Sequence, residues 1–188
     1  MKILKVISLA LVIVLFLGIA LVYGGIFNVA ADDSHWRITS RLIESVRERS
    51  IAVGARAVGA PPALEDPQLI AIGAGHYAEM CTGCHLAPGM AETEIRAGLY
   101  PKPQNLARQG RQRSPEETFW IIKHGLKMSG MPAWGVTHDD RSIWGLAAFV
   151  MRLPRMTAEQ YRAATQREAT PAASPEHHHE HTHDEGEH

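Results

Sequence analysis

The chain opens with a long apolar segment, before any amphipathic pattern appears. From Val6 to Ala31 no residue is charged. The first part of this segment, Val6–Phe27, would extend about 33 Å as a helix, which is enough for a hydrocarbon core of roughly 30 Å. We therefore expect residues 1–31 to be a transmembrane signal-anchor, the single membrane-spanning helix of the chain.

A cleaved signal peptide is the alternative interpretation of this segment. Small residues at Val29-Ala30-Ala31 would suit a peptidase, but signal peptides have apolar cores of only about 7–15 residues. Lys2 and Lys5 precede the apolar segment, and the positive-inside rule leaves them in the cytoplasm. Both interpretations export the rest of the chain.

Residues 32–66 form a juxtamembrane region that begins with an amphipathic helix. Ile38, Leu42 and Val46 recur at i, i+4 and i+8, so they share one helical face. Such a helix could lie on the lipid surface, dock against the following domain, or be a solvated spacer. An Ala- and Gly-rich stretch ending in Pro61-Pro62 then reads as a linker.

Helix start and stop signals divide residues 67–156 into an all-α domain. Asp66-Pro67 is typical of a helix start, and Ser114-Pro115-Glu116-Glu117 contains a capping box. A third helix runs from about residues 137–140 to Leu153, where Pro154 ends it. No alternating strand pattern of useful length separates these helices.

The last segment, residues 157–188, is predicted to be a disordered tail rich in histidine and acidic residues. Its histidines, interleaved with acids, could hold copper, nickel or zinc. The alternative is a solvated tail that gains positive charge as the pH falls. The histidines concerned are His177, His178, His179, His181 and His183.

Charge and cysteine content exclude two classes of protein. The domain over residues 67–156 carries ten Lys/Arg against seven Asp/Glu, within a chain of formal net charge −1. A nucleic-acid binder would concentrate far more positive charge on one face. Two cysteines cannot support a disulfide-rich scaffold.

Both cysteines lie in Cys81-Thr82-Gly83-Cys84-His85, a CxxCH run that is the attachment sequence for c-type haem. Two thiols at this spacing can each add to a porphyrin vinyl group, and the next residue can then offer an imidazole nitrogen to the iron. A thioredoxin-like redox pair would need a βαβ unit, and a zinc site would need a second Cys/His pair. The sequence predicts neither inside the domain.

The second axial ligand of such a haem is predicted to be Met131. A thioether is the soft ligand that raises the reduction potential of electron-transfer cytochromes. Gly130 and Pro132 flank Met131 and stiffen its loop, which favours it over Met128. The sequence offers other candidates, which we consider less suitable: Met80 beside the first cysteine, Met151 on the last helix, and His124 and His138 at helix termini.

With these residues identified, the chain from about Asp66 to Pro154 resembles the class I c-type cytochromes, close to the monohaem domains of bacterial respiratory complexes. The matching features, in the family's order, are Gly73, Tyr77, the CxxCH run, Pro103, Asn105-Leu106, the Ser114–Gly125 helix, Gly130-Met131-Pro132 and Phe149. The resemblance implies a cytochrome c fold of about three to five helices around one covalently attached haem c. It also implies that the first and last helices cross at Gly73. The proximal histidine would donate to a proline carbonyl, that of Pro103 or, second, of Pro88.

These features together predict an electron carrier and not an enzyme. A haem iron held by His85 and Met131 has no open position for oxygen or peroxide. The expected partners are a quinol-oxidising complex or dehydrogenase as donor and a terminal oxidase as acceptor. The haem domain would lie on the periplasmic side of the cytoplasmic (inner) membrane. The alternative is a haem enzyme or ligand-binding protein in which Met131 is labile.

A basic set in the domain also has two interpretations. It could steer an acidic redox partner, or some of its arginines could pair with haem propionates. The set comprises Lys102, Arg108, Arg111, Arg113, Lys123 and Lys127.

Overall fold

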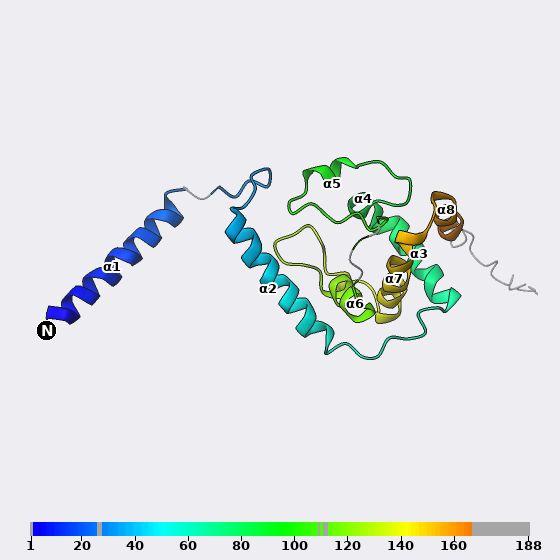
Figure 1. The fold of residues 1–188 in the computed structure, drawn as a ribbon, viewed down its shortest axis with the longest axis horizontal. Coiled ribbons are helices and arrows are strands. Elements are labelled where there is room, and N and C mark those ends of the chain that lie inside the picture. Colours follow the sequence, from blue (N-terminus) through cyan, green and yellow to red (C-terminus); the bar gives the residue numbers. More distant parts are fainter. Residues whose placement is uncertain (1, 26–27, 109, 111–112, 167–188) are drawn as a thin grey trace, which may run out of the picture.

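The computed structural model describes residues 2–25, 28–108, 110 and 113–166, and over these residues its regular structure is entirely helical (Figure 1). The elements in chain order are α1 (Lys2–Tyr23), α2 (Arg37–Ala55), α3 (Pro67–Met80), α4 (Thr82–His85), α5 (Glu94–Gly98), α6 (Pro115–His124), η1 (Trp134–Val136), α7 (Asp140–Arg152), η2 (Leu153–Arg155) and α8 (Ala158–Gln166). The two η elements are single turns of 3₁₀ helix. The prediction of an all-α fold is confirmed.

Helix α1 is apolar on every side and contributes nothing to the core. Its most apolar window has a mean hydropathy of 3.0, and none of that window is buried. A helix that is apolar all round needs an apolar environment on all sides. Its length and composition suit a membrane span, and a signal sequence shares both properties.

The core is built on the crossing of α3 and α7. Gly73 on α3 faces Gly145 on α7, and a Cβ atom at Gly73 would overlap the Gly145 carbonyl. The missing side chain lets the two backbones touch, as the resemblance implied. Around this crossing the core contains Tyr77 from α3, Phe119 from α6 and Phe149 from α7.

The start signals read from the sequence are present in the structure. The Asp66 carboxylate accepts from the Gln68 backbone N–H at 2.9 Å, with Pro67 at the first helical position. Ser114 and Glu117 form the full capping box of α6. These caps satisfy N–H groups that would otherwise lack partners in the first turn.

One face of helix α2 docks on the domain. Of the three alternatives considered for this helix, docking on the following domain is therefore observed for that face. Ile51 is fully buried, and Gly54 lies so close to the Trp120 indole of α6 that a Cβ there would overlap it. The Ile38, Leu42 and Val46 stripe does not take part in this contact and stays exposed. The juxtamembrane helix is thus part of the folded domain, although its predicted apolar face is not the one that docks.

The structure differs from the sequence prediction at the start of the tail. Residues 158–166, expected to be disordered, form α8, which packs against α3. The ring of Tyr161 lies 6.4 Å from that of Tyr77 and 6.1 Å from that of Phe149. An aromatic contact with the core stabilises a helix whose own composition is unremarkable. The histidine-rich part of the tail, residues 177–188, lies outside the described residues.

Candidate functional site

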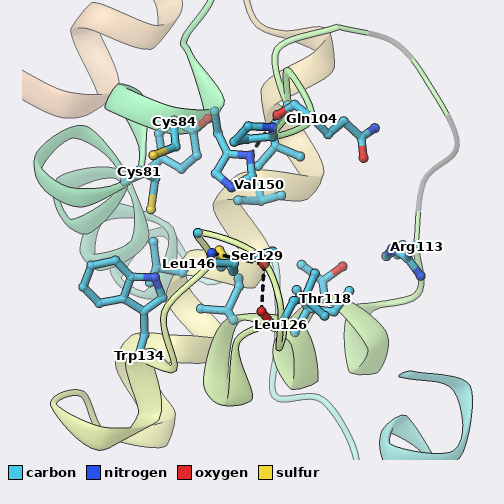
Figure 2. Close-up of a pocket in the computed structure, with 18 of the residues that line it drawn as sticks. Cys81, Cys84, Gln104, Arg113, Thr118, Leu126, Ser129, Trp134, Leu146 and Val150 are labelled. Carbon is cyan, nitrogen blue, oxygen red and sulfur yellow. Dashed lines mark hydrogen bonds between the residues drawn. The ribbon is translucent and has the colours of Figure 1, made fainter. Parts of the chain in front are cut away.

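A cavity of about 370 Å³ opens between α3, α6, α7 and the loops that join them (Figure 2). Its volume is within the range of small-molecule sites, and most of its wall is apolar. Cys81, Cys84, His85 and Met131 all line it. The fold thus brings the four predicted site residues to one cavity, although Met131 comes from a loop far along the chain.

The CxxCH run consists of Cys81, which caps the end of α3, and the four residues of the short helix α4. Helix α3 ends at Met80, and the His85 backbone N–H donates to the Cys81 carbonyl at 2.8 Å. Both thiols are free, and Figure 2 shows them at one end of the cavity. Burial, together with the neighbouring Cys84, raises the pKa of the Cys81 thiol to about 12. A thiol with so high a pKa is protonated at neutral pH.

A buried hydrogen bond fixes the end of this turn. The Tyr77 hydroxyl donates to the Leu86 carbonyl at 2.6 Å, and Tyr77 is fully buried. Leu86, directly after His85, has a φ of 60°, an uncommon value for a residue with a side chain. The Thr93 hydroxyl also donates to the Gly83 carbonyl. These contacts hold the CxxCH backbone from both sides.

The imidazole of His85 is oriented by a backbone carbonyl. Nδ1 lies 2.8 Å from the Gln104 carbonyl oxygen, and because a carbonyl only accepts, Nδ1–H is the donor. Nε2 then keeps its lone pair, as a metal-binding imidazole requires. Burial lowers the pKa of His85, the Gln104 hydrogen bond opposes this shift, and Arg96 adds to it. The neutral ring is the form that binds metal.

The expectation that a proline carbonyl accepts from His85 was wrong. The acceptor is Gln104, one residue beyond Pro103, and Pro88 is not involved. The His85 carbonyl also accepts from the Leu106 backbone N–H at 3.1 Å. Two contacts between residue 85 and residues 104–106 set the register of this loop, and that register presents the Gln104 carbonyl to the ring.

Met131 lies in a loop whose two ends, Leu126 and Met131, are joined by hydrogen bonds. The Leu126 N–H donates to the Met131 carbonyl at 3.2 Å, and the Met131 N–H donates to the Ser129 hydroxyl at 3.2 Å. Ser129 in turn donates to the Leu126 carbonyl at 2.7 Å, a bond drawn in Figure 2. The backbone of Met131 is therefore held at both its N–H and its C=O.

Gly125, which ends α6, makes this closure sterically possible. It has a φ of +65°, and a Cβ there would lie 2.7 Å from the carbonyl oxygens of Met131 and Pro132. A side chain would be strained in this backbone conformation and would also push the Met131 loop away.

The other candidate ligands divide into two groups. Met128, His124 and His138 do not line the cavity. Met128 is 74% exposed, His124 is exposed beside the Trp120 ring, and His138 packs against His76 and Trp134. Met80 and Met151 do line the cavity, together with Met131.

One rim of the cavity is basic, and it fits the acidic groups of a porphyrin. Arg47, Lys102, Arg108 and Arg113 line it. Nη1 of Arg113 is buried and makes no hydrogen bond among the described residues, and the Glu117 carboxylate lies 3.9 Å from it. A buried guanidinium N–H usually has a partner, and a carboxylate is the one it binds best. Haem carries two propionate carboxylates, so an apolar cavity with this rim suits it.

Two residues of this site were missed by sequence reasoning. Arg47 belongs to α2, which the sequence separates from the domain by a linker, and Gln104 acts through its backbone. No local pattern signals either role.

Of the basic set identified in the sequence, Lys102 pairs with Glu92, Arg113 with Glu48 and Lys123 with Asp140. Arg111 lies outside the described residues.

Comparison with protein families gives one match. Residues 68–150 match the family described as "Cytochrome C oxidase, cbb3-type, subunit III". The match begins one residue inside α3 and ends near the end of α7, so it contains the whole CxxCH turn and the Met131 loop. Comparison with curated proteins gave no match, and neither did comparison with solved structures. The domain over residues 68–150 is therefore a class I c-type cytochrome domain.

Proposed function

We propose that this protein is a membrane-anchored electron carrier with one haem c, which Cys81 and Cys84 would attach and whose iron His85 and Met131 would bind. The observation that carries the proposal is the convergence of these four residues on one apolar cavity. When bound, the haem supplies the one-electron couple between ferric and ferrous iron.

The chain's own residues do four things at this site. The two thiols are the points of covalent attachment, and the Gln104 carbonyl holds the His85 ring with Nε2 free. The closed loop over residues 126–131 holds the Met131 backbone at its N–H and its C=O, which would fix the position from which Met131 reaches the iron. Arg113, with Arg47 beside it, is the partner we propose for a propionate.

The anchor and the partners follow from the sequence and the family. Helix α1 would cross the cytoplasmic membrane and leave the domain on the periplasmic side. A respiratory donor, either a quinol-oxidising complex or a dehydrogenase, would reduce the haem, and a terminal oxidase or another acceptor would oxidise it. Intramolecular pairing of Lys102, Arg113 and Lys123 leaves less of the basic set free for steering an acidic partner.

Covalent attachment is tested by extracting membrane-purified protein with acidic acetone. We expect the colour to stay with the polypeptide and the intact mass to exceed the chain mass by one haem. The same mass reports whether residues 1–31 are retained. Colour that leaves with the solvent would overturn the proposal.

Axial ligation is tested by spectroscopy of Met131→Leu, with Met128→Leu as the matched control. Methionine-ligated ferric haem has a weak far-red absorption band, which Met131→Leu should abolish and Met128→Leu should keep. The parent protein's spectrum should not change under carbon monoxide. A band that survives Met131→Leu would assign the ligand to another methionine, and a carbon monoxide adduct would favour the haem enzyme.

A further inference from the structure

Helix α2 carries an exposed apolar stripe along the face that points away from the domain. Ile38, Leu42, Val46 and Val53 are between 61% and 77% exposed. At 100° per residue they fall within one sector of about 80°. Trp36, directly before the helix, is 82% exposed. Large apolar side chains gathered on one exposed face favour an interaction surface there.

The opposite face of α2 is held by the domain at three places. Near its start, the His35 N–H donates to the Tyr100 hydroxyl at 3.1 Å, and their rings stack. In the middle, Arg113 binds Glu48 at 2.7 Å. Towards its end, Ile51 is buried and Gly54 contacts Trp120. The stripe cannot rotate inward without breaking all three contacts, so it is fixed outward.

Positive charge accompanies the apolar stripe. Arg49 lies within the same sector, Arg56 follows the end of the helix on the same side, and Arg41 lies about 60° beyond the edge of the sector; all three are exposed. The exposed Glu44 lies about 160° away from the middle of the stripe. An apolar stripe flanked by arginine, with a tryptophan at one end, has the composition of a helix that lies in a membrane interface.

We propose that this face of α2 lies on the membrane surface, in contact with anionic phospholipid. The inference rests on the proposed function in one respect, the crossing of the membrane by α1. Residues 24–36 join α1 to α2, and these thirteen residues reach at most about 45 Å. A tether this short keeps the stripe at high local concentration near the lipid, so even weak surface affinity is enough.

Charge also favours lipid over a second copy of the chain. A two-fold contact through this stripe would bring the arginines of both copies together, and like charges repel there. Anionic headgroups, by contrast, attract each arginine near the surface. Docking of α2 would fix the orientation of the domain relative to the membrane. Helix α2 is part of the domain, since Arg47 on its inner face lines the cavity.

The test uses the full holoprotein in nanodiscs that hold one chain each. A spin label is placed on Val46→Cys, with Val136→Cys as the matched control because Val136 is also exposed, at 82%. The parent chain, treated with the same label, gives the background from Cys81 and Cys84, which the proposed haem attachment would block. In nanodiscs with anionic lipid we expect the label at 46 to favour collisions with oxygen, which concentrates in lipid. The label at 136 should favour a water-soluble nickel chelate.

Three outcomes separate this inference from the proposal about α1. A label on Leu15→Cys reports whether α1 is in the bilayer. If position 15 is in lipid while position 46 is as aqueous as position 136, the docking of α2 is wrong and the anchor stands. If position 15 is aqueous, the anchor itself is wrong. If the label at 46 becomes immobile only in discs that hold two chains, a second copy covers the stripe and the inference is overturned.

The role of charge is tested with Arg41→Gln/Arg49→Gln. In the parent chain we expect the oxygen preference at position 46 to fall several-fold when anionic lipid is replaced by zwitterionic lipid. The double variant should show this lower preference in both lipids. An equal preference of the parent in both lipids would show that headgroup charge plays no part and would overturn the assignment to anionic phospholipid.

Discussion

The backbone of Gly73 lies against the carbonyl group of Gly145, so that α3 and α7 touch without any side chain between them. The contact is reciprocal, because a Cβ at Gly145 would lie 2.8 Å from the Leu69 carbonyl oxygen. Both helices border the cavity, with Tyr77 on one and Leu146 on the other. The separation of α3 and α7 therefore helps to set the shape of this cavity.

Gly73→Ala should destabilise the domain, because neither backbone can move without opening the core. Overpacking of this kind typically costs about 1–3 kcal/mol, and 1 kcal/mol lowers the Tm of a domain of this size by roughly 4–8 °C. Thermal unfolding of the holoprotein, followed by circular dichroism, measures the loss. Gly59→Ala is the control, since nothing lies within 4 Å of a Cβ there. Equal Tm values would contradict the crossing.

Gly125→Ala should weaken the proposed iron–sulfur bond and leave most of the fold intact. The added Cβ pushes on the carbonyls of Met131 and Pro132 from a strained backbone conformation. We expect the far-red band to weaken and carbon monoxide to bind the reduced protein. Gly98→Ala has open space around the new Cβ and should change neither property. An unchanged spectrum of Gly125→Ala would mean that the loop does not control ligation.

Tyr77→Phe should destabilise the domain, because it removes only the hydroxyl group that donates to Leu86. The variant leaves the Leu86 carbonyl without the donor that now lies at 2.6 Å. A buried acceptor that loses its partner costs about 1–3 kcal/mol. Guanidinium unfolding measures the cost, and Tyr161→Phe, on the half-buried ring of α8, is the matched control. The role given to this hydrogen bond is refuted if both variants unfold at the same midpoint.

Glu48 should make the docking of α2 depend on pH. Hydrogen bonding to Arg113 lowers the pKa of the Glu48 carboxyl from its ordinary value of 4.5. Because the folded pKa is the lower one, the stabilisation is fully present above about pH 4.5. This stabilisation is lost as the pH falls through the pKa that Glu48 has in the folded protein. The pair is partly exposed, so about 0.5–1 kcal/mol is at stake.

The measurement is the Tm difference between the parent and Glu48→Gln at pH 7 and at pH 3. We expect the variant to unfold earlier at pH 7 and the two curves to converge at pH 3. Glu44→Gln serves as control, since the Glu44 side chain is 64% exposed and its ion pair with Arg47 is longer, at 3.5 Å. A difference that persists unchanged at pH 3 would show that charge is not the cause.

Tyr161→Ala should show that α8 is part of the folded domain. The Tyr161 ring covers Tyr77 and Phe149, so its removal exposes two core rings. Truncation of a half-buried aromatic residue should cost about 1–3 kcal/mol, less than for a fully buried one. Amide exchange of α3 and α7 should accelerate with it, whereas the exposed neighbour variant Arg162→Ala should leave both unchanged. If the two variants behave alike, α8 does not stabilise the core.

The sequence alone determined those features that depend on neighbouring residues. The cap at Asp66, the capping box at Ser114 and the CxxCH turn are local, because each hydrogen bond joins groups within four residues. The all-α class followed from spacing, and the crossing at Gly73 followed from the family resemblance. Met131 was singled out by its loop, and the structure adds that the loop reaches the cavity while Met128 does not.

Tertiary structure decided everything that depends on residues far apart in the chain. The His85 ring meets the Gln104 carbonyl, Arg47 reaches the cavity, and Tyr161 covers Tyr77. None of these contacts leaves a local pattern, because a backbone carbonyl has no sequence signature and a helix can dock with either face. The apolar stripe of α2 predicted a helix correctly but did not predict the face that docks. The docking face is instead the one that carries Ile51 and Gly54, because the missing side chain of Gly54 allows close contact with Trp120.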